Sequence, residues 1–180
     1  MKIRLAAELQ PDSIVDGLGI RTVIWTQGCP HNCPGCHNPS THSFEDGCFI
    51  ETKEIKEELK HLKNQTGITF SGGDPMCQPE ACSDIAKYAR TLGMNIWCYT
   101  GYTFEELLAM NNQKVLDFLK EIDVLIDGRF MMEQKSLNLK FKGSKNQRTI
   151  NVKKSLLEGK VVLEQDGDEI QFEPKEGIFV

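Results

Sequence analysis

Strand-like and helix-like segments alternate along most of this 180-residue chain. Residues 21–27 are rich in β-branched and aromatic side chains, and residues 52–63 repeat apolar side chains at helical spacing. The same alternation predicts further strands at 67–70, 95–99 and 123–126 and further helices at 79–91, after Thr103 and at 113–122. This order favours right-handed βαβ units, so we expect an α/β fold with a mainly parallel sheet.

The remaining segments are expected to belong to the same domain, because 180 residues fall within the usual size of one domain. A fifth strand is expected at 148–152. Two strand-like segments near the C-terminus, 160–164 and 169–172, flank Asp166-Gly167, a pair typical of hairpin turns. The predicted parts of the domain are a lead-in at 1–20, a core at 21–158 and a short C-terminal β-hairpin tail at 159–180.

Polar and small residues follow directly after each of the first four predicted strands. Parallel sheets place their ligands at the carboxyl ends of the strands. We therefore expect these segments to meet at one edge of the sheet and to form a single site. The four segments are residues 28–38, 71–75, 100–101 and 127–129.

The chain has seven cysteines, an odd number and too few for a secreted domain built on disulfides. Residues 1–8 contain too short an apolar stretch for a secretory signal, so we expect a cytoplasmic protein whose thiols are catalytic or bind metal. No apolar run is long enough for a membrane span. The formal net charge of −5 argues against a broad nucleic-acid surface.

Three of the cysteines, Cys29, Cys33 and Cys36, lie within one short loop in the pattern C-x3-C-x2-C. Thiolates so close together select zinc, copper(I) or an iron–sulfur cluster. His31 or His37 could complete a zinc site, so a non-catalytic zinc-binding interaction module is one possible interpretation. An iron–sulfur cube held by three cysteines leaves one iron open for a small molecule, which is a catalytic arrangement.

This cysteine spacing after the first βαβ strand resembles that of the radical S-adenosylmethionine enzymes. The segments 16–21, 27–29 and 36–39 resemble the enzymes of that superfamily that activate glycyl-radical proteins, and 72–75 resembles their Gly-Gly-Glu turn. The segments 127–130 and 143–148 resemble the branch that acts on anaerobic ribonucleoside-triphosphate reductases. The resemblance covers roughly residues 12–152.

Three positions depart from the usual pattern of the family. Leu18 stands where a proline is usual, and Asp74 stands where the superfamily more often has a glutamate. Gly35 replaces an aromatic residue, so the adenine is expected to contact backbone groups near Gly35 and His37 rather than an aromatic ring.

The resemblance implies a partial (βα) barrel and a defined reaction. A 4Fe–4S cluster on Cys29, Cys33 and Cys36 would reductively cleave S-adenosylmethionine to methionine and a 5′-deoxyadenosyl radical. That radical would remove a hydrogen atom from a glycine of the anaerobic ribonucleoside-triphosphate reductase. Another glycyl-radical enzyme, such as pyruvate formate-lyase, is the alternative partner. Reduced flavodoxin or ferredoxin is the expected electron donor.

Position after the strands and the resemblance together predict the residues that bind S-adenosylmethionine. Arg129 is expected to bind the carboxylate, Asp74 the amino group and Asp127 the ribose hydroxyls. The full predicted set is Gly35, Cys36, His37, Gly72, Gly73, Asp74, Thr100, Asp127 and Arg129.

The other cysteines are expected to pack as small hydrophobic residues. Cys82 and Cys98 are the clearest cases, and Cys77 is the one expected to approach the site. Cys48 belongs to the same group. The lysine-rich segment 135–148 is expected to be a solvated loop.

Overall fold

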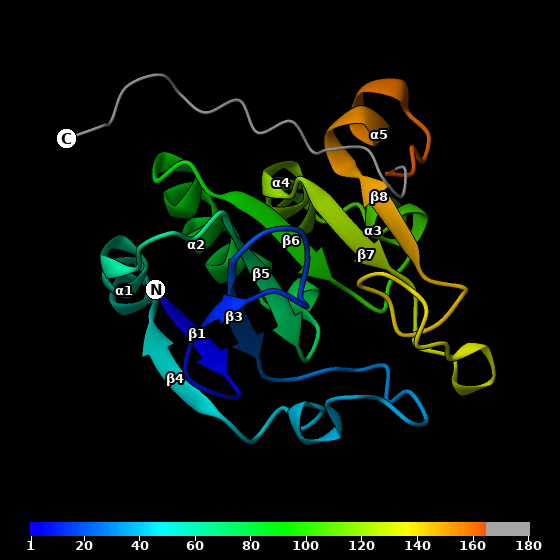
Figure 1. Cartoon of the computed structure of the whole chain (residues 1–180), viewed down its shortest axis with the longest axis horizontal. Coiled ribbons are helices and arrows are strands. Elements are labelled where there is room, and N and C mark those ends of the chain that lie inside the picture. Colours follow the sequence, from blue (N-terminus) through cyan, green and yellow to red (C-terminus); the bar gives the residue numbers. More distant parts are fainter. Residues whose placement is uncertain (165–180) are drawn as a thin grey trace.

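A computed structural model describes residues 1–164 and shows one open, mixed β-sheet (Figure 1). The strands run in the spatial order β4-β1-β3-β5-β6-β7-β8, with β2 paired to β3. The four central strands β3, β5, β6 and β7 are parallel, which confirms the predicted α/β fold, and every other pairing is antiparallel. The strands are β1 (Lys2–Leu5), β2 (Gln10–Ser13), β3 (Arg21–Thr26), β4 (Cys48–Glu51), β5 (Gly67–Gly72), β6 (Asn95–Tyr99), β7 (Val124–Asp127) and β8 (Arg148–Asn151).

Helices cover one face of this sheet, and their apolar sides form the main core (Figure 1). Ile24, Phe70, Ile96 and Leu125 point from the four parallel strands into this core and are fully buried. The predicted capping box is present, since Thr103 and Glu106 each bind the backbone N–H of the other. The α-helices are α1 (Thr52–His61), α2 (Pro79–Thr91), α3 (Phe104–Ala109), α4 (Gln113–Glu121) and α5 (Val152–Glu158).

Loops rather than helices cover the opposite face of the sheet. A small apolar cluster there joins Trp97, Val124 and Ile126 of β6 and β7 to Tyr99 and to Phe141, which lies in the long loop after β7. Trp97 and Phe141 meet edge to face with ring centroids 5.3 Å apart. An open sheet with helices outside and loops inside is a partial barrel. Within residues 1–164, its inner face is free of helices and is covered by the loops that line the site.

Sequence analysis missed the three short strands β1, β2 and β4. Residues 1–20 therefore do more than lead into the core, because β1 and β2 pair with β3. The predicted strand at 160–164 is reduced to one isolated bridge between Ile150 and Leu163. The predicted hairpin turn at Asp166-Gly167 and the strand at 169–172 lie outside the described residues.

The fifth predicted strand, β8, is present and antiparallel to β7. Its first residue, Arg148, pairs with the last residue of β7, Asp127. The segment that precedes β8 therefore lies at the carboxyl edge of the parallel strands. Within residues 1–164, no helix is both long enough and apolar enough to cross a membrane.

Candidate functional site

The carboxyl ends of the parallel strands surround a cavity of about 480 Å³. Residues from all four of the predicted segments line it, so the expected convergence is confirmed. The structure adds two further walls, the loop before β3 with Asp16 and the loop after β7 with Lys142. The predicted site residues that line the cavity are Cys29, Cys33, Cys36, His37, Gly72, Gly73, Asp74, Thr100 and Arg129.

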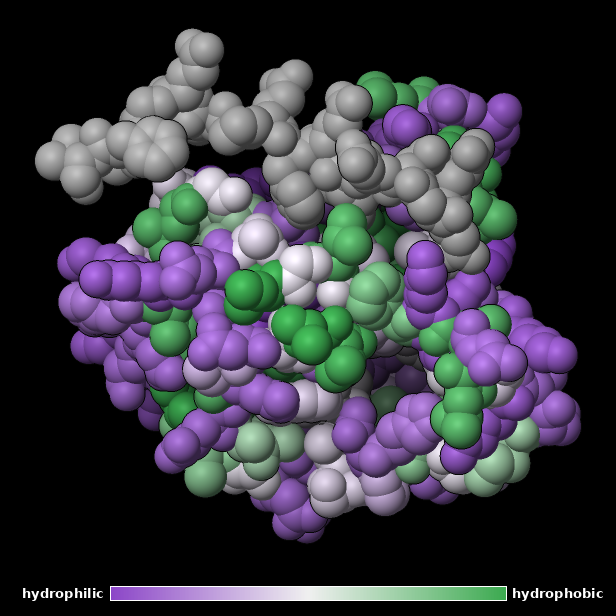
Figure 2. Space-filling view, viewed as in Figure 1, coloured by the Kyte–Doolittle hydropathy of each residue, from purple (hydrophilic) through white to green (hydrophobic). Residues whose placement is uncertain are grey.

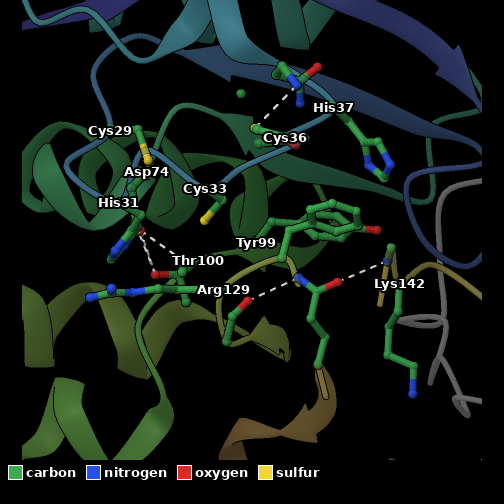
Figure 3. A pocket seen from close by; sticks show the side chains of 18 of the residues that line it. Cys29, His31, Cys33, Cys36, His37, Asp74, Tyr99, Thr100, Arg129 and Lys142 are labelled. Atoms are coloured by element: carbon green, nitrogen blue, oxygen red, sulfur yellow. Dashed lines mark hydrogen bonds and ion pairs between the residues drawn. The ribbon is translucent and has the colours of Figure 1, made fainter. Parts of the chain in front are cut away.

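The three cysteines of residues 28–38, the cluster loop, are half-buried free thiols at one side of this cavity. Their sulfur atoms surround one space (Figure 3). A turn at the end of the loop, closed by the N–H of Cys36 donating to the carbonyl of Cys33 at 3.1 Å, brings the last two cysteines together. Within residues 1–164, no three His, Cys, Asp or Glu side chains surround a single metal ion.

Three thiols around one cavity are a suitable donor set for an iron–sulfur cluster. Burial raises the pKa of Cys29 and of Cys33 above the ordinary thiol value. Both groups are therefore protonated at neutral pH before any metal arrives. Binding of iron would displace these protons, because the thiolate is the ligand.

Asp74 ties the cluster loop to the ends of two strands. Its carboxylate is 1% exposed and lies 2.7 Å from His31 Nε2. It also accepts hydrogen bonds of 3.0 Å from the Thr100 hydroxyl and from the backbone N–H groups of Met76 and Gly101. The His31 ring fills the space that a side chain at Gly101 would need. Sequence analysis treated His31 only as loop polarity or a zinc ligand and missed this contact.

The glycine pair after β5 brings the turn at Asp74 directly against the start of the cluster loop. The Gly73 N–H donates to the carbonyl of Thr26 at 2.7 Å, and the Asp74 N–H donates to the carbonyl of Gly28 at 2.8 Å. The backbone of Gly28 fills the space where a Cβ at residue 73 would lie. Only glycine permits this approach, so the pair sets the position of the Asp74 carboxylate relative to the cysteines.

Asp127 does not line the cavity, and the predicted contact with ribose does not fit its position. Its carboxylate is 1% exposed and accepts from the N–H of Phe104 at 2.8 Å, at the start of α3. It also accepts from the Arg148 guanidinium, which pairs with Glu105 as well. These two carboxylates raise the pKa of Arg148. Asp127 is thus an anchor between β7, α3 and β8.

The segment 143–148, which carried part of the family resemblance, closes the loop after β7. The Gln147 side chain accepts from the backbone N–H groups of 143–144 at 2.9 and 3.2 Å and donates to the carbonyl of Gly128 at 3.0 Å. Asn146 donates to the carbonyl of Arg129 at 2.8 Å. The Gln147 amide therefore joins both ends of residues 128–147, the roof loop, and together with Asn146 it fixes the backbone at Gly128 and Arg129.

The roof loop also packs on the cluster loop. Met132 Cε occupies the space that a side chain at Gly35 would need. Gly35, which was predicted to be near the adenine, is not part of the cavity lining. The His37 ring stacks at a tilt against Phe130 with centroids 4.9 Å apart. The cluster loop is thus held on both flanks, by Asp74 through His31 and by the roof loop through Gly35 and His37.

Arg129 is the cation best placed to bind an anionic ligand. Its side chain lines the cavity and forms no ion pair or hydrogen bond among residues 1–164 (Figure 3). Arg21, by contrast, is fully buried, and burial lowers its pKa to about 9. Arg21 donates to the carbonyl of Leu18 at 3.0 Å and to the hydroxyl of Thr69 at 2.7 Å. It therefore anchors the loop before β3, whose Asp16 lines the cavity.

The four remaining cysteines differ in their surroundings. Cys82 and Cys98 are fully buried, as predicted. Cys48 is exposed, which contradicts the expectation that it packs as a small hydrophobe, because β4 is an edge strand. Cys77 is half-buried and does not line the cavity. Burial, and to a smaller extent the negative charge of Asp74, raises the pKa of the Cys77 thiol to about 12.

Comparison with known proteins identifies the family. Residues 15–150 match the family described as a 4Fe-4S single cluster domain. The anaerobic ribonucleoside-triphosphate reductase-activating protein of Escherichia coli (strain K12) is 38% identical over 147 residues, covering 76% of this chain and 92% of that protein. The protein of the same name from Enterobacteria phage T4 is 36% identical over 148 residues, covering 78% and 89%. The chain belongs to the family of anaerobic ribonucleoside-triphosphate reductase-activating proteins.

Membership of the activating-protein family confirms the resemblance drawn from the segments 127–130 and 143–148. Both segments lie in the matched region, and the structure places them in the roof loop and its closure. Among solved structures, QueE from Escherichia coli superposes with a TM-score of 0.47 at 13% identity, over 57% of this chain and 54% of that chain.

Proposed function

We propose that this protein activates an anaerobic ribonucleoside-triphosphate reductase by generating its glycyl radical. The observation that carries the proposal is a loop with three thiols that opens into the same cavity as an unpaired arginine. Membership of the activating-protein family supports the choice of partner. Cys29, Cys33 and Cys36 would hold a 4Fe–4S cluster, and its open iron would bind S-adenosylmethionine.

The cofactors supply the chemistry, and the chain supplies ligation and orientation. When bound and reduced, they yield methionine and a 5′-deoxyadenosyl radical, which removes a hydrogen atom from a glycine of the reductase. Arg129 would bind the methionine carboxylate with its planar guanidinium. Asp74, held in place by Thr100 and His31, offers a carboxylate to the amino group. The backbone of Gly72 and Gly73 positions that carboxylate.

A different carboxylate from the predicted one is available to the ribose. Asp16 lines the cavity from the loop before β3, whereas Asp127 is turned away from it. The Ser13 hydroxyl donates to the Asp16 carboxylate and orients it. We therefore assign Asp16 to the ribose hydroxyls in place of Asp127, and Cys36 and His37, which line the same cavity, would contact the adenine.

The reaction consumes one electron for each cofactor cleaved, and a reduced flavodoxin or ferredoxin would supply it. Half-buried free thiols and a reducible cluster suit the cytoplasm, where we propose that the protein acts. Neither a nucleic acid nor a membrane is needed for this function.

Anaerobic reconstitution with iron and sulfide, followed by addition of dithionite and S-adenosylmethionine, tests the proposal. We expect about four irons per chain, release of 5′-deoxyadenosine, and a glycyl-radical signal in electron paramagnetic resonance when the reductase is present. A signal with pyruvate formate-lyase alone would assign the protein to a different partner. A colourless protein with one bound zinc would replace the enzyme with a zinc-binding module.

A further inference from the structure

Much of the roof loop is strongly basic in an otherwise acidic chain, and two of its lysines, Lys135 and Lys142, line the cavity. Residues 131–145, the lysine surface, contain four lysines and one glutamate, whereas the whole chain has a net charge of −5. None of these lysines forms an ion pair among residues 1–164, whereas eight other lysines and arginines in that range do. The four lysines are Lys135, Lys140, Lys142 and Lys145.

Apolar side chains stand exposed among these lysines. Leu137 is 91% exposed, Met132 is 50% exposed and Met131 is 37% exposed. Figure 2 shows hydrophobic residues bordered by hydrophilic ones beside the hollow in the surface, on the side where Figure 1 places this loop. Leu137 also lines the cavity, whereas Met131 and Met132 do not, so the exposed apolar side chains continue from the cavity rim to the outside of the loop. An apolar centre with a charged rim is typical of a protein-docking surface.

The lysine surface lies against the outside of the cluster loop. Met132 packs on Gly35, between Cys33 and Cys36, and Phe130 packs on His37. A protein seated on this surface therefore lies next to the cysteine turn. Lys140 and Lys145 are not part of the cavity lining, so a protein that contacts them does not have to enter the cavity.

We propose that the lysine surface docks an acidic one-electron carrier protein that reduces the cluster. This inference rests on the proposed function, which requires an external electron. In that step, the carrier would lose one electron and a cluster held by Cys29, Cys33 and Cys36 would gain it, with no proton or bond exchanged. Opposite charges speed such an encounter and orient it, and electron-transfer complexes manage with small interfaces. The reductase, by contrast, must bring a glycine into the cavity itself.

A double charge reversal tests the inference, because Lys140 and Lys145 do not line the cavity. The test variant is Lys140→Glu with Lys145→Glu, and the matched control is Lys53→Glu with Lys87→Glu on helices α1 and α2. Each protein is reconstituted and supplied with either reduced flavodoxin or dithionite. The readouts are the rate of 5′-deoxyadenosine release and, separately, the Kd for flavodoxin by calorimetry.

We expect the test variant to bind flavodoxin at least about tenfold more weakly and to lose a similar factor in the flavodoxin-driven rate. With dithionite it should stay within about twofold of the wild type, and the control should match the wild type with both reductants. Added salt should weaken the binding of flavodoxin to the wild type.

Equal flavodoxin binding and rates in the test variant and the wild type would overturn the docking inference. A loss of rate with both reductants would also overturn it, because the loop would then act in the site. A normal flavodoxin-driven rate with loss of radical transfer to the reductase would assign the surface to the reductase. If the wild type releases no 5′-deoxyadenosine with either reductant, the proposed function fails, while the calorimetric arm still tests the docking.

Discussion

Asp74 and Asp127 are two carboxylates at the same edge of the parallel sheet, one after β5 and the other at the end of β7, and both are 1% exposed. Asp74, after β5, faces the cavity and takes its partners from the cluster loop and from β6. Asp127, at the end of β7, faces away and takes its partners from α3 and β8. Burial and position alone therefore do not distinguish a site carboxylate from a scaffold carboxylate. The direction and the partners of the side chain do.

The largest effect is expected from Asp74→Ala. His31, Thr100 and two backbone N–H groups would lose their acceptor, and the cluster loop would lose its attachment through His31. We expect the rate of S-adenosylmethionine cleavage to fall by about 100-fold or more, with less iron retained after reconstitution. Iron analysis and 5′-deoxyadenosine release measure both. Near-normal values for both would mean that Asp74 is no more important to the site than Asp127.

Asp127→Ala should separate stability from activity. The change leaves the N–H of Phe104 and part of the Arg148 guanidinium without an acceptor at the start of α3. Because Arg148 is partly exposed and keeps Glu105, we expect the free energy of unfolding to fall by only about 2 kcal/mol. Urea unfolding measures this change. The KM for S-adenosylmethionine should stay within about twofold, and a large rise would restore Asp127 to the site.

Gln147→Ala tests whether the roof loop positions Arg129 for the cofactor. Without the amide, the carbonyl of Gly128, next to Arg129, loses the contact that joins the two ends of the loop, while Asn146 still donates to the carbonyl of Arg129. With dithionite as reductant, we expect the KM for S-adenosylmethionine to rise about fivefold while kcat changes little. Asn138→Ala, in the same loop, serves as the control and should leave both constants unchanged. An equal fall in kcat for both variants would indicate a general loss of loop structure.

The smallest effect is expected from Glu105→Gln, which removes the exposed carboxylate that pairs with Arg148. The ion pair with Arg148 lowers the pKa of Glu105, so the charged carboxylate stabilises the fold. Its contribution is fully present above the ordinary Glu range and is lost as the pH falls through the lowered value. Glu105→Gln should therefore cost a few tenths of a kcal/mol at neutral pH and nothing in strong acid. Thermal unfolding across that range checks the sign, and a larger loss in acid would contradict it.

Much of the fold was predictable because its central elements have strong local patterns. The bounds of α2 and β6 agree with the prediction, since the helical periodicity of one and the short apolar run of the other were both clear. The strands β1, β2 and β4 were missed because they are short and form by antiparallel pairing with distant segments. Their existence depends on partners that no local pattern reveals.

The site was predictable to the level of the loops but not of every side chain. The cysteine spacing and the strand order placed Cys29, Asp74 and Arg129 at one edge, and the structure brings them to one cavity. The role of Asp127 was misassigned because it depends on Arg148, and the antiparallel direction of β8 was not foreseen. The contact between His31 and Asp74 likewise joins loops that are far apart in the sequence.

Reconstitution of the cysteine variants tests the central claim most directly. Cys29→Ala, Cys33→Ala and Cys36→Ala should each prevent the assembly of a stable 4Fe–4S cluster and abolish 5′-deoxyadenosine release. Cys82→Ala, which changes a fully buried cysteine on α2, should keep both iron and activity. Iron content, visible absorption and product release are measured side by side under anaerobic conditions. Full activity in any of the three loop variants would contradict the account.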